Sequence, residues 1–277
     1  MSAESPDSLF PKSLVLVGAG KMGGAMLEGW IASGLSSDAV TVIDPLPAPQ
    51  LTAFCKAKGV RLNPATPPAV PQVLVLGIKP QMLDAAAPVL APLAGAETLV
   101  VSILAGKTIA NLKARLPEAR SIVRSMPNLP ASVGRGISGA VASAEVTPEQ
   151  KAIADTLLKG VGQVEWVDRE ELIDAVTGVS GSGPAYVFHL VECLAKAGEA
   201  EGLPADLALR LARATVEGAG ELLHRSDLSA ETLRQNVTSP GGTTAAGLTV
   251  LMGEGALEKL IASTVHAARR RAADLSG

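Results

Sequence analysis

The first half of the chain alternates short, continuously apolar runs with segments of helical or turn character. Strands are predicted where β-branched residues gather, at residues 14–17, 40–43, 73–78 and 99–103. These runs lack the polar alternation of a half-exposed strand, which is expected when helices cover both faces of a sheet. Because strands that alternate with helices pair in parallel, this half is predicted to form a doubly wound α/β sheet.

The second half has a different character, since long helical patterns replace the β-rich runs from about Asp168. Helices are predicted over Ala205–His224 and Leu257–Leu275. Apolar residues of the second helix recur at three- and four-residue spacing, so one of its faces is expected to be buried. Small residues line one side of the first helix and admit another helix closely, either from within the chain or from a second copy.

Composition and charge argue against two classes of function. The chain has 24 Lys and Arg residues against 27 Asp and Glu, a net charge of -3, and no basic patch interleaved with aromatics, which argues against a nucleic-acid partner. Its potential soft metal ligands are scattered, so reduced thiols and no metal are expected. These residues are Cys55, Cys193, His189, His224 and His266.

Neither export nor membrane insertion is expected from the sequence. The stretch before Pro11 lacks the basic start and the apolar run of an export signal, so residence in the cytoplasm is predicted. The longest weakly charged stretch, residues 85–106, contains Glu97, prolines and a glycine. These residues indicate a helix, a turn and a strand rather than a membrane span.

The stretch Gly18–Gly23 reads Gly-Ala-Gly-Lys-Met-Gly, directly follows the first predicted strand and opens a helix. In this context the first glycine permits a tight turn, the second lets a pyrophosphate approach the backbone, and the third lets helix and strand pack. The N-terminus of the helix attracts the anion. A Rossmann-like dinucleotide site is therefore predicted, with contacts from Gly18, Gly20, Lys21, Met22 and Gly23.

Asp44 ends the second predicted strand about twenty residues after Gly23, where an acid accepts hydrogen bonds from the adenosine ribose hydroxyls. The following residues, Pro45–Pro47, offer no cation to a 2′-phosphate, so NADH is plausible. NADPH stays open because cations of other loops can reach the phosphate. The alternative is that Asp44 is only a turn former before proline.

Two later strand ends supply further candidates for cofactor binding. Lys79 and Pro80 follow the third predicted strand, and Ala105 and Gly106 follow the fourth. Ligands of open parallel sheets bind outside the carboxyl ends of the strands, so these residues are expected to border the nicotinamide. The alternatives are a solvated lysine and an ordinary turn.

Four stretches together resemble the pyrroline-5-carboxylate reductase family, and the likeness runs from about Ser13 to the end of the chain. They are Gly18–Gly23, Arg124–Pro130, Asp174–Tyr186 and Asn236–Thr244. The last two are far more specific than the glycine fingerprint, which many dehydrogenases share. The resemblance implies reduction of (S)-1-pyrroline-5-carboxylate to L-proline, the last step of proline biosynthesis, by hydride from NADH or NADPH in a homodimer or a larger assembly of dimers.

With this resemblance the chain is expected to have three parts. Residues 1–11 form a disordered tail, residues 12–165 a dinucleotide-binding domain, and residues 166–277 an all-helical domain for substrate binding and dimerisation. The boundary follows a predicted helix, Pro148–Lys159, and a short strand that contains Trp166.

The stretch Ser239–Thr244 combines a proline-stiffened turn, two glycines and hydroxyls that enter a helix. Such a turn presents N–H groups to an anion, here the carboxylate of a small imino-acid substrate. Thr244 matches the family's substrate threonine and is the catalytic candidate, either orienting the ring nitrogen or relaying a proton through water. The alternative is that Thr243 or Thr244 caps the helix. The predicted substrate-binding set is Ser182, Ser239, Gly241, Gly242, Thr243 and Thr244.

Three further positions carry open alternatives. The turn Ser180–Pro184 is expected to end one helical run and start a new helix at Pro184, and it either lines the active-site cleft, as the resemblance implies, or forms a corner with serine caps. Asn128 either touches a ligand at a sheet end or caps itself in a rigid proline loop. The surroundings of Asp227 depart from the family's pattern, which puts its role in doubt.

Two rival functions remain open from the sequence. A β-hydroxyacid dehydrogenase would share the glycine turn and a helical second domain, but it needs a catalytic lysine on the helix after Gly183, where Lys196 comes only late. The other rival is a dinucleotide-binding module without turnover, and the intact turn Gly241–Thr244 argues against it.

Overall fold

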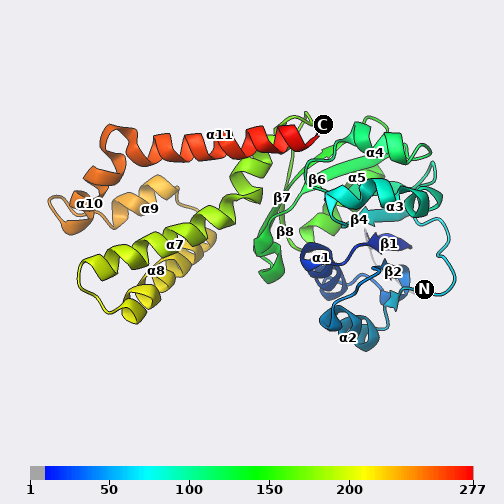
Figure 1. The fold of residues 1–277 in the computed structure, drawn as a ribbon, viewed down its shortest axis with the longest axis horizontal. Coiled ribbons are helices and arrows are strands. Elements are labelled where there is room, and N and C mark those ends of the chain that lie inside the picture. The colour runs from blue at the N-terminus through cyan, green and yellow to red at the C-terminus, as the bar shows by residue number, and fades with distance from the viewer. Residues whose placement is uncertain (1–9, 277) are drawn as a thin grey trace, which may run out of the picture. The chain divides into compact units, whose positions relative to one another are not determined.

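Eight strands form one sheet within residues 10–276, the part of the chain that the computed structural model describes (Figure 1). Their order across the sheet is β3-β2-β1-β4-β5-β6-β7-β8. Strands β1 to β6 run parallel, whereas β7 is antiparallel to β6 and parallel to β8. The strands are β1 Leu14–Val17, β2 Val40–Ile43, β3 Arg61–Leu62, β4 Val73–Leu76, β5 Leu99–Ser102, β6 Ile122–Met126, β7 Gly136–Ala142 and β8 Gly162–Trp166. Residues 1–9 of the predicted tail lie outside the described part.

Helices cover both faces of the sheet, as the continuously apolar strands predict. Within β1, Leu14 and Leu16 pack into one hydrophobic cluster and Val15 and Val17 into the other. The first face carries α1 Lys21–Ala32, α2 Pro49–Lys58 and α5 Pro148–Lys159, and the second carries α3 Leu83–Leu90 and α4 Ile109–Arg115. The predicted doubly wound α/β fold is therefore confirmed.

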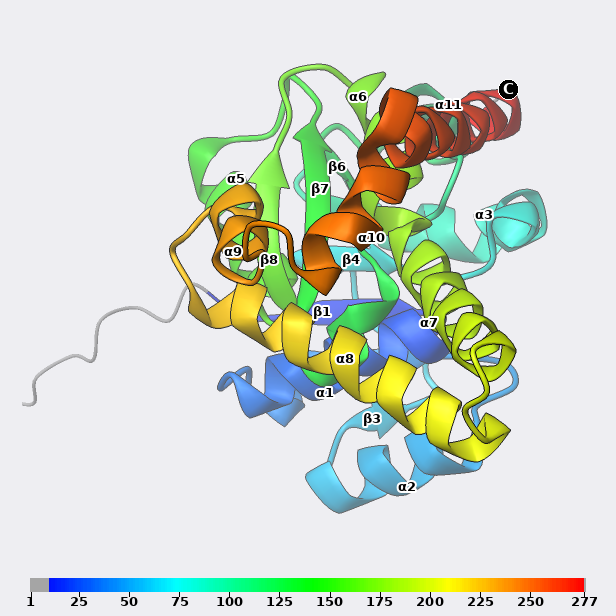
Figure 2. The ribbon, with the colours of Figure 1, turned by 90° about the vertical axis from the view of Figure 1, so that its left-hand side faces the viewer.

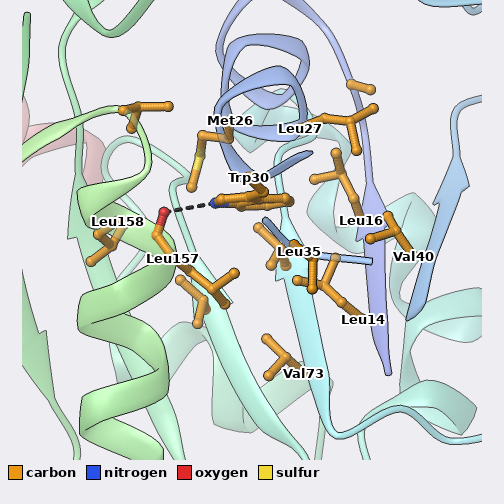
Figure 3. Packing of buried hydrophobic residues seen from close by; sticks show 14 of the residues in the cluster. Leu14, Leu16, Met26, Leu27, Trp30, Leu35, Val40, Val73, Leu157 and Leu158 are labelled. Atoms are coloured by element: carbon orange, nitrogen blue, oxygen red, sulfur yellow. Dashed lines mark hydrogen bonds between the residues drawn. The ribbon is translucent and has the colours of Figure 1, made fainter. Parts of the chain in front are cut away.

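Trp30 is the largest side chain of the first cluster and lies between α1 and the sheet (Figure 3). It is fully buried, and its indole Nε1 donates a hydrogen bond to the carbonyl oxygen of Leu157, 2.6 Å away. Leu157 belongs to the last turn of α5, where carbonyl groups lack partners within the helix. The indole satisfies one of these carbonyls and ties α1 to α5.

Strands β3 and β7 are not predicted from the sequence. With two residues, β3 is too short to show a pattern, and it forms by pairing with β2. Strand β7 reads GISGAVA, a run of mostly small residues, so its conformation depends on pairing with β6 and β8 more than on local preference. Two predicted strands end earlier than expected, at Leu76 and Ser102, and the residues that follow form turns at the edge of the sheet.

The described residues fall into two compact units. The first holds the sheet and comprises the described residues up to Gly181 together with those from Ala268 on, and the second is Ser182–Ala267. The later helices are α6 Leu172–Val176, a π-helical turn Thr177–Gly181, α7 Gly183–Ala200, α8 Ala205–Arg225, α9 Ala230–Asn236, α10 Thr243–Met252 and α11 Ala256–Ser276. Short 3-10 turns are η1 Ser37–Ala39, η2 Pro80–Met82, η3 Ala91–Leu93, η4 Leu129–Val133 and η6 Gly253–Gly255. The assignment of dinucleotide binding to residues 12–165 and of substrate binding and dimerisation to residues 166–277 stays a prediction.

In the second unit α7 and α8 lie side by side (Figure 2). Small residues permit this approach, since a Cβ added at Gly198 would lie 3.2 Å from the Cβ of Ala208. Other apolar positions of the unit remain exposed. Among them are Val187, Phe188, Leu190, Leu209, Leu222, Leu223, Val250 and Leu260.

Residues 10–276 contain neither a helix suited to span a membrane nor a cluster of potential metal ligands. No helix in this range is long and apolar enough to cross a membrane. No group of three or more His, Cys, Asp or Glu side chains in the same range is arranged to hold a metal ion.

Candidate functional site

Close backbone contacts shape the glycine turn between β1 and α1. Gly18 has φ +86°, a conformation that favours glycine, and a Cβ there would lie 2.6 Å from the backbone nitrogen of Ile78. A Cβ at Gly23 would overlap the carbonyl oxygen of Gly18, so the third glycine lets α1 lie against the turn. A Cβ at Gly20 would meet no described atom within 4 Å, which leaves open space at the middle of the turn.

The start of α1 is suited to an anion. The helix begins at Lys21 with Gly20 as its N-cap, and no side chain in the described part of the chain caps it. Its first N–H groups therefore lack partners within the helix and carry the positive end of the helix dipole. The first turn also lacks an acidic residue. A pyrophosphate fits this cradle, with Lys21 exposed and Met22 half-buried beside it.

Asp44 closes the turn from the end of β2. Its Oδ2 accepts a hydrogen bond from the N–H of Ala19, and its Oδ1 accepts one from the N–H of Leu46, both at 2.9 Å. The carboxylate is therefore a turn former and at the same time part of the wall of the glycine turn. Each oxygen keeps a further lone pair for a ligand hydroxyl.

Asn63 holds Asp44 in place and is a residue that sequence reasoning missed. Its Oδ1 accepts the N–H of Asp44 at 2.9 Å, and its Nδ2 donates to the carbonyl oxygen of Asp44 at 2.6 Å. The only local signal is an Asn-Pro pair after a two-residue strand, because the contact arises from the pairing of β3 with β2. Together with Ile43 and Pro64, Asn63 also lines an apolar cavity of about 630 Å³.

The other cofactor candidates stand at the carboxyl ends of β4 and β5. Lys79 is exposed and precedes the 3-10 turn that Pro80 begins. Ala105 is exposed, whereas Gly106 is buried with φ +70°. A Cβ at Gly106 would lie 2.9 Å from the Cβ of Leu275, so the last turn of α11 accounts for the close approach at this glycine.

A cavity of about 200 Å³ joins three of the four motif stretches of the sequence. Lys21 and Met22 come from the first stretch, Pro127 and Asn128 from the second, and Gly181 from the third. The cavity lies at the carboxyl ends of the strands, where open α/β sheets bind ligands.

Asn128 stabilises the loop that lines this cavity. Its Oδ1 accepts a hydrogen bond from the N–H of Ile137, nine residues further along the chain, at 3.0 Å. The expected alternative of a self-capped asparagine is therefore wrong. The side chain instead fastens the loop after β6 to the start of β7.

The fourth stretch forms a tight bend in the second unit. Gly241 has φ +70°, and the N–H of Gly242 donates to the carbonyl oxygen of Ser239 at 3.1 Å. Helix α10 starts at Thr243 with Gly242 as its N-cap, and no described side chain caps it, so the alternative of a capping Thr243 or Thr244 is wrong. Both threonines are exposed in the first turn. The bend thus presents hydroxyls beside uncapped N–H groups.

Ser182 lies between the π-helical turn and α7. It occupies the N-cap position of α7, but neither it nor another described side chain makes a capping hydrogen bond there. The hydroxyl of Ser180 donates instead to the carbonyl oxygen of Val176 at 3.1 Å. The alternative of a corner with serine caps is therefore wrong, whereas a helix does begin beside Pro184 as predicted. Asp227 is exposed in the loop between α8 and α9.

The sequence-predicted residues thus form two groups. The glycine turn, Asp44 and the ends of β4 and β5 belong to the first unit, and Ser182 and the bend Ser239–Thr244 belong to the second.

Two family models match the chain, one for each half. Residues 13–106 match the family described as NADP oxidoreductase, coenzyme F420-dependent. Residues 170–275 match the family described as pyrroline-5-carboxylate reductase dimerisation. The chain is also 38% identical over 265 residues to a pyrroline-5-carboxylate reductase from Pseudomonas aeruginosa, and the match covers 95% of this chain and 96% of that protein.

Solved structures extend the match to the fold. A pyrroline-5-carboxylate reductase from Coxiella burnetii is similar with a TM-score of 0.88 and 35% identity, over 96% of this chain and 99% of that one. The Plasmodium falciparum pyrroline carboxylate reductase with NADP bound has a TM-score of 0.77 and 26% identity, over 96% and 98% of the two chains. With identity well above 30% along nearly the whole of both sequences, the chain belongs to the pyrroline-5-carboxylate reductase family.

Proposed function

We propose that this chain reduces (S)-1-pyrroline-5-carboxylate to L-proline, with a nicotinamide dinucleotide as the reductant. The observation that carries the proposal is the cavity of about 200 Å³ in which the glycine turn, the loop after β6 and Gly181 converge. Family membership favours this reaction over the oxidation of a β-hydroxyacid, which needs a lysine on α7 well before Lys196. It also argues against a binding module without turnover.

The first unit binds the coenzyme in this proposal. The uncapped N–H groups of α1 and the open space at Gly20 hold the pyrophosphate, and Asp44 accepts hydrogen bonds from the adenosine ribose. The apolar cavity beside Asn63 takes the adenine ring. The strand-end residues Lys79, Pro80, Ala105 and Gly106 border the nicotinamide half. When bound, the reduced nicotinamide supplies a hydride.

The bend Ser239–Thr244 holds the substrate, with Ser182 as a further contact. The uncapped N–H groups of α10 donate to the substrate carboxylate, and each such charge-assisted hydrogen bond contributes about 1.5–3 kcal/mol. Thr244 orients the ring nitrogen or relays a proton to it through water, because a threonine hydroxyl is itself a poor acid. Fixing the imine in place is a large part of the catalysis.

NADH is the preferred coenzyme in this proposal. The carboxylate of Asp44 is fixed by the N–H groups of Ala19 and Leu46, so it cannot turn away from a 2′-phosphate. Two like charges in contact repel each other, and Pro45–Pro47 supplies no cation to offset them. We expect kcat/KM to be higher with NADH than with NADPH when both are measured against pyrroline-5-carboxylate.

A homodimer, or a larger assembly of dimers, is the working form. The dimerisation model of the family matches residues 170–275, and large apolar side chains of the second unit are exposed in the single chain. The assignment of residues 12–165 to the dinucleotide, the assignment of residues 166–277 to substrate binding and dimerisation, and residence in the cytoplasm complete the proposal.

Steady-state kinetics test the activity directly. We expect oxidation of NADH or NADPH that depends on pyrroline-5-carboxylate, and no reduction of NAD+ by a panel of β-hydroxyacids. Turnover of a hydroxyacid without turnover of pyrroline-5-carboxylate would reverse the assignment.

Thr244→Ala tests the role of the bend. Loss of the hydroxyl that orients the ring nitrogen or relays a proton to it is expected to lower kcat/KM for pyrroline-5-carboxylate about 10- to 100-fold, with the Kd for NADH unchanged. Thr249→Ala is the matched control, because Thr249 lies on the same helix and its hydroxyl donates to the carbonyl oxygen of Ala245 at 3.0 Å. Equal losses in the two variants would remove Thr244 from the site.

A further inference from the structure

Two ion pairs surround Arg124 on β6, whose side chain is 3% exposed, whereas its partners Glu170 and Asp174 are partly buried. Its Nη1 lies 3.1 Å from Oε1 of Glu170, and its Nη2 lies 3.1 Å from Oδ1 of Asp174. The same oxygen of Glu170 accepts the N–H of Ile109, the first residue of α4, at 2.8 Å. One guanidinium therefore ties β6 to α4 and α6.

Stability alone does not explain these ion pairs. Taking charges out of water costs free energy that their attraction offsets only in good geometry, and apolar residues of similar volume often pack as stably. A planar guanidinium adds direction, because its fork fixes two carboxylates at once, whereas a lysine ammonium is a point charge. Arg124 thus fixes the orientation of the segment that contains Asp174.

Strand β6 holds this segment at a second point. The side chains of Arg124 and Met126 share one face of the strand, because they are two residues apart. A Cβ at Gly181 would lie 2.7 Å from Cε of Met126, so the end of the π-helical turn Thr177–Gly181 rests on this methionine. Strand β6 therefore contacts this segment twice, at Asp174 in α6 through Arg124 and at Gly181 at the end of the π-helical turn through Met126.

This stretch ends at the wall of the cavity of about 200 Å³ described above. Gly181 lines it together with Lys21 and Met22 of the first motif stretch and with Pro127 and Asn128, which directly follow β6. A shift of α6 would change the position of Gly181, whereas the glycine turn is held separately by its contacts with Gly77 and Ile78. The π-helical turn itself is an uncommon geometry that is frequent at functional sites.

We infer that Arg124 is a positioning residue for the hydride-transfer end of the active site. Its two ion pairs fix α6 and the π-helical turn, and through them the wall at Gly181. The inference rests on the proposed function, because that proposal is carried by this same cavity. Arg124 acts through Asp174 and Gly181 rather than on the reacting atoms.

Two variants test the inference. Arg124→Lys keeps the positive charge but loses the fork, and Asp174→Asn is a milder change that keeps an acceptor oxygen should the lysine variant not fold. Because small misplacements of reacting groups cost rate, kcat is expected to fall at least about tenfold in each variant, while the Kd for ADP-ribose stays within about twofold. ADP-ribose probes only the adenosine and pyrophosphate part of the site. Arg115→Lys is the control, since Arg115 pairs with the exposed Asp84 at 2.6 Å on the surface.

Three results would count against the inference or the proposed function. A wild-type kcat in folded variants, as judged by circular dichroism at the assay temperature, would overturn the inference. So would a Kd for ADP-ribose that rises in proportion to the loss of kcat, because that would indicate general loosening of the first unit. Absence of pyrroline-5-carboxylate-dependent turnover in the unaltered chain would instead refute the proposed function, so the two failures are distinguishable.

Discussion

The carboxylate of Asp44 accepts N–H groups from Ala19 and Leu46, and its backbone is held by the side chain of Asn63. The carboxylate is therefore fixed at the wall of the glycine turn. In the proposed function this carboxylate favours a ribose hydroxyl over a 2′-phosphate, because like charges in contact disfavour each other.

Asp44→Ser is expected to reduce the preference for NADH over NADPH at least about tenfold, equivalent to about 1.4 kcal/mol. Serine keeps a hydroxyl for the ribose while removing the negative charge. The measurement is kcat/KM for both coenzymes in the same buffer, and Glu28→Gln, an exposed charge removal on α1, is the control. An unchanged ratio in Asp44→Ser would show that the preference is set elsewhere.

Trp30→Phe is expected to lower the free energy of unfolding by about 1–3 kcal/mol, because the carbonyl of Leu157 loses its buried donor. Urea denaturation measures the loss. Trp166→Phe is the matched change, and it should cost less, since Trp166 is only partly buried and its Asp155 partner can be hydrated. Equal stability of Trp30→Phe and the unaltered protein would contradict the role given to the indole.

At the scale of elements, the sequence predicts best where a pattern is complete within one segment. Helix α5 has the predicted bounds, Pro148–Lys159, because Thr147 and Gln150 form a capping box before an amphipathic run. Strands β1 and β2 also have their predicted bounds. By contrast β7 depends on its neighbours in the sheet, and its glycines and serine carry no strand signal of their own.

The parts of the candidate site are also predictable only where their residues lie close together in the sequence. The glycine turn is predictable because strand, turn and helix are consecutive in the sequence. The clamp of Asn63 on Asp44 and the meeting of Met22, Asn128 and Gly181 arise from the order of strands in the sheet, which no local pattern specifies. The ion pairs of Arg124 join residues about fifty positions apart and were missed for the same reason.

Helix α4 is joined to the loop after β7 by an ion pair that gives a pH-dependent contribution to stability. Lys113 Nζ lies 2.7 Å from Oε1 of Glu145. The hydrogen bond from Lys113, followed by those from the Glu145 backbone N–H and the Ser143 hydroxyl, lowers the pKa of the Glu145 carboxyl from 4.5 to about 2. Because this pKa is lowered by folding, the contribution is present above the unfolded value and is lost as the pH falls toward about 2.

Lys113→Met is therefore expected to lower the urea midpoint at pH 7, with a deficit relative to the unaltered protein that shrinks as the pH falls from 4.5 toward about 2. The pair is half-exposed, so the deficit at neutral pH should also shrink in about 1 M NaCl, where the Debye length is about 3 Å. A deficit that stays constant across this pH range would indicate a packing effect of the lysine stem instead.

At the scale of the whole molecule, the second unit is the part whose large apolar side chains are not covered within a single chain. Phe188 on α7 is 56% exposed and Leu222 on α8 is 61% exposed. Other large apolar side chains of the second unit are exposed as well. Exposed apolar surface of this kind marks an association surface. The dimerisation model of the family matches this region, which indicates a second copy of the chain as the partner.

Phe188→Asp combined with Leu222→Asp is expected to weaken self-association at least about 100-fold, since an unpaired charge buried in an interface costs about 3 kcal/mol or more. Light scattering after size exclusion should show the mass of one chain at concentrations where the unaltered protein is a dimer or larger. Leu46→Asp, at a residue of the first unit that is 89% exposed, is the control for an added charge. An assembly unaffected by the double change would place the interface elsewhere.

The path of the hydride is the most direct test of the account. Pyrroline-5-carboxylate is incubated with the protein and with NADH carrying deuterium at the transferable C4 position, and the product is analysed by mass spectrometry and NMR. The account predicts L-proline with a single deuterium at C5, formed in proportion to the coenzyme oxidised. Proline without deuterium, or coenzyme oxidation without proline, would contradict it.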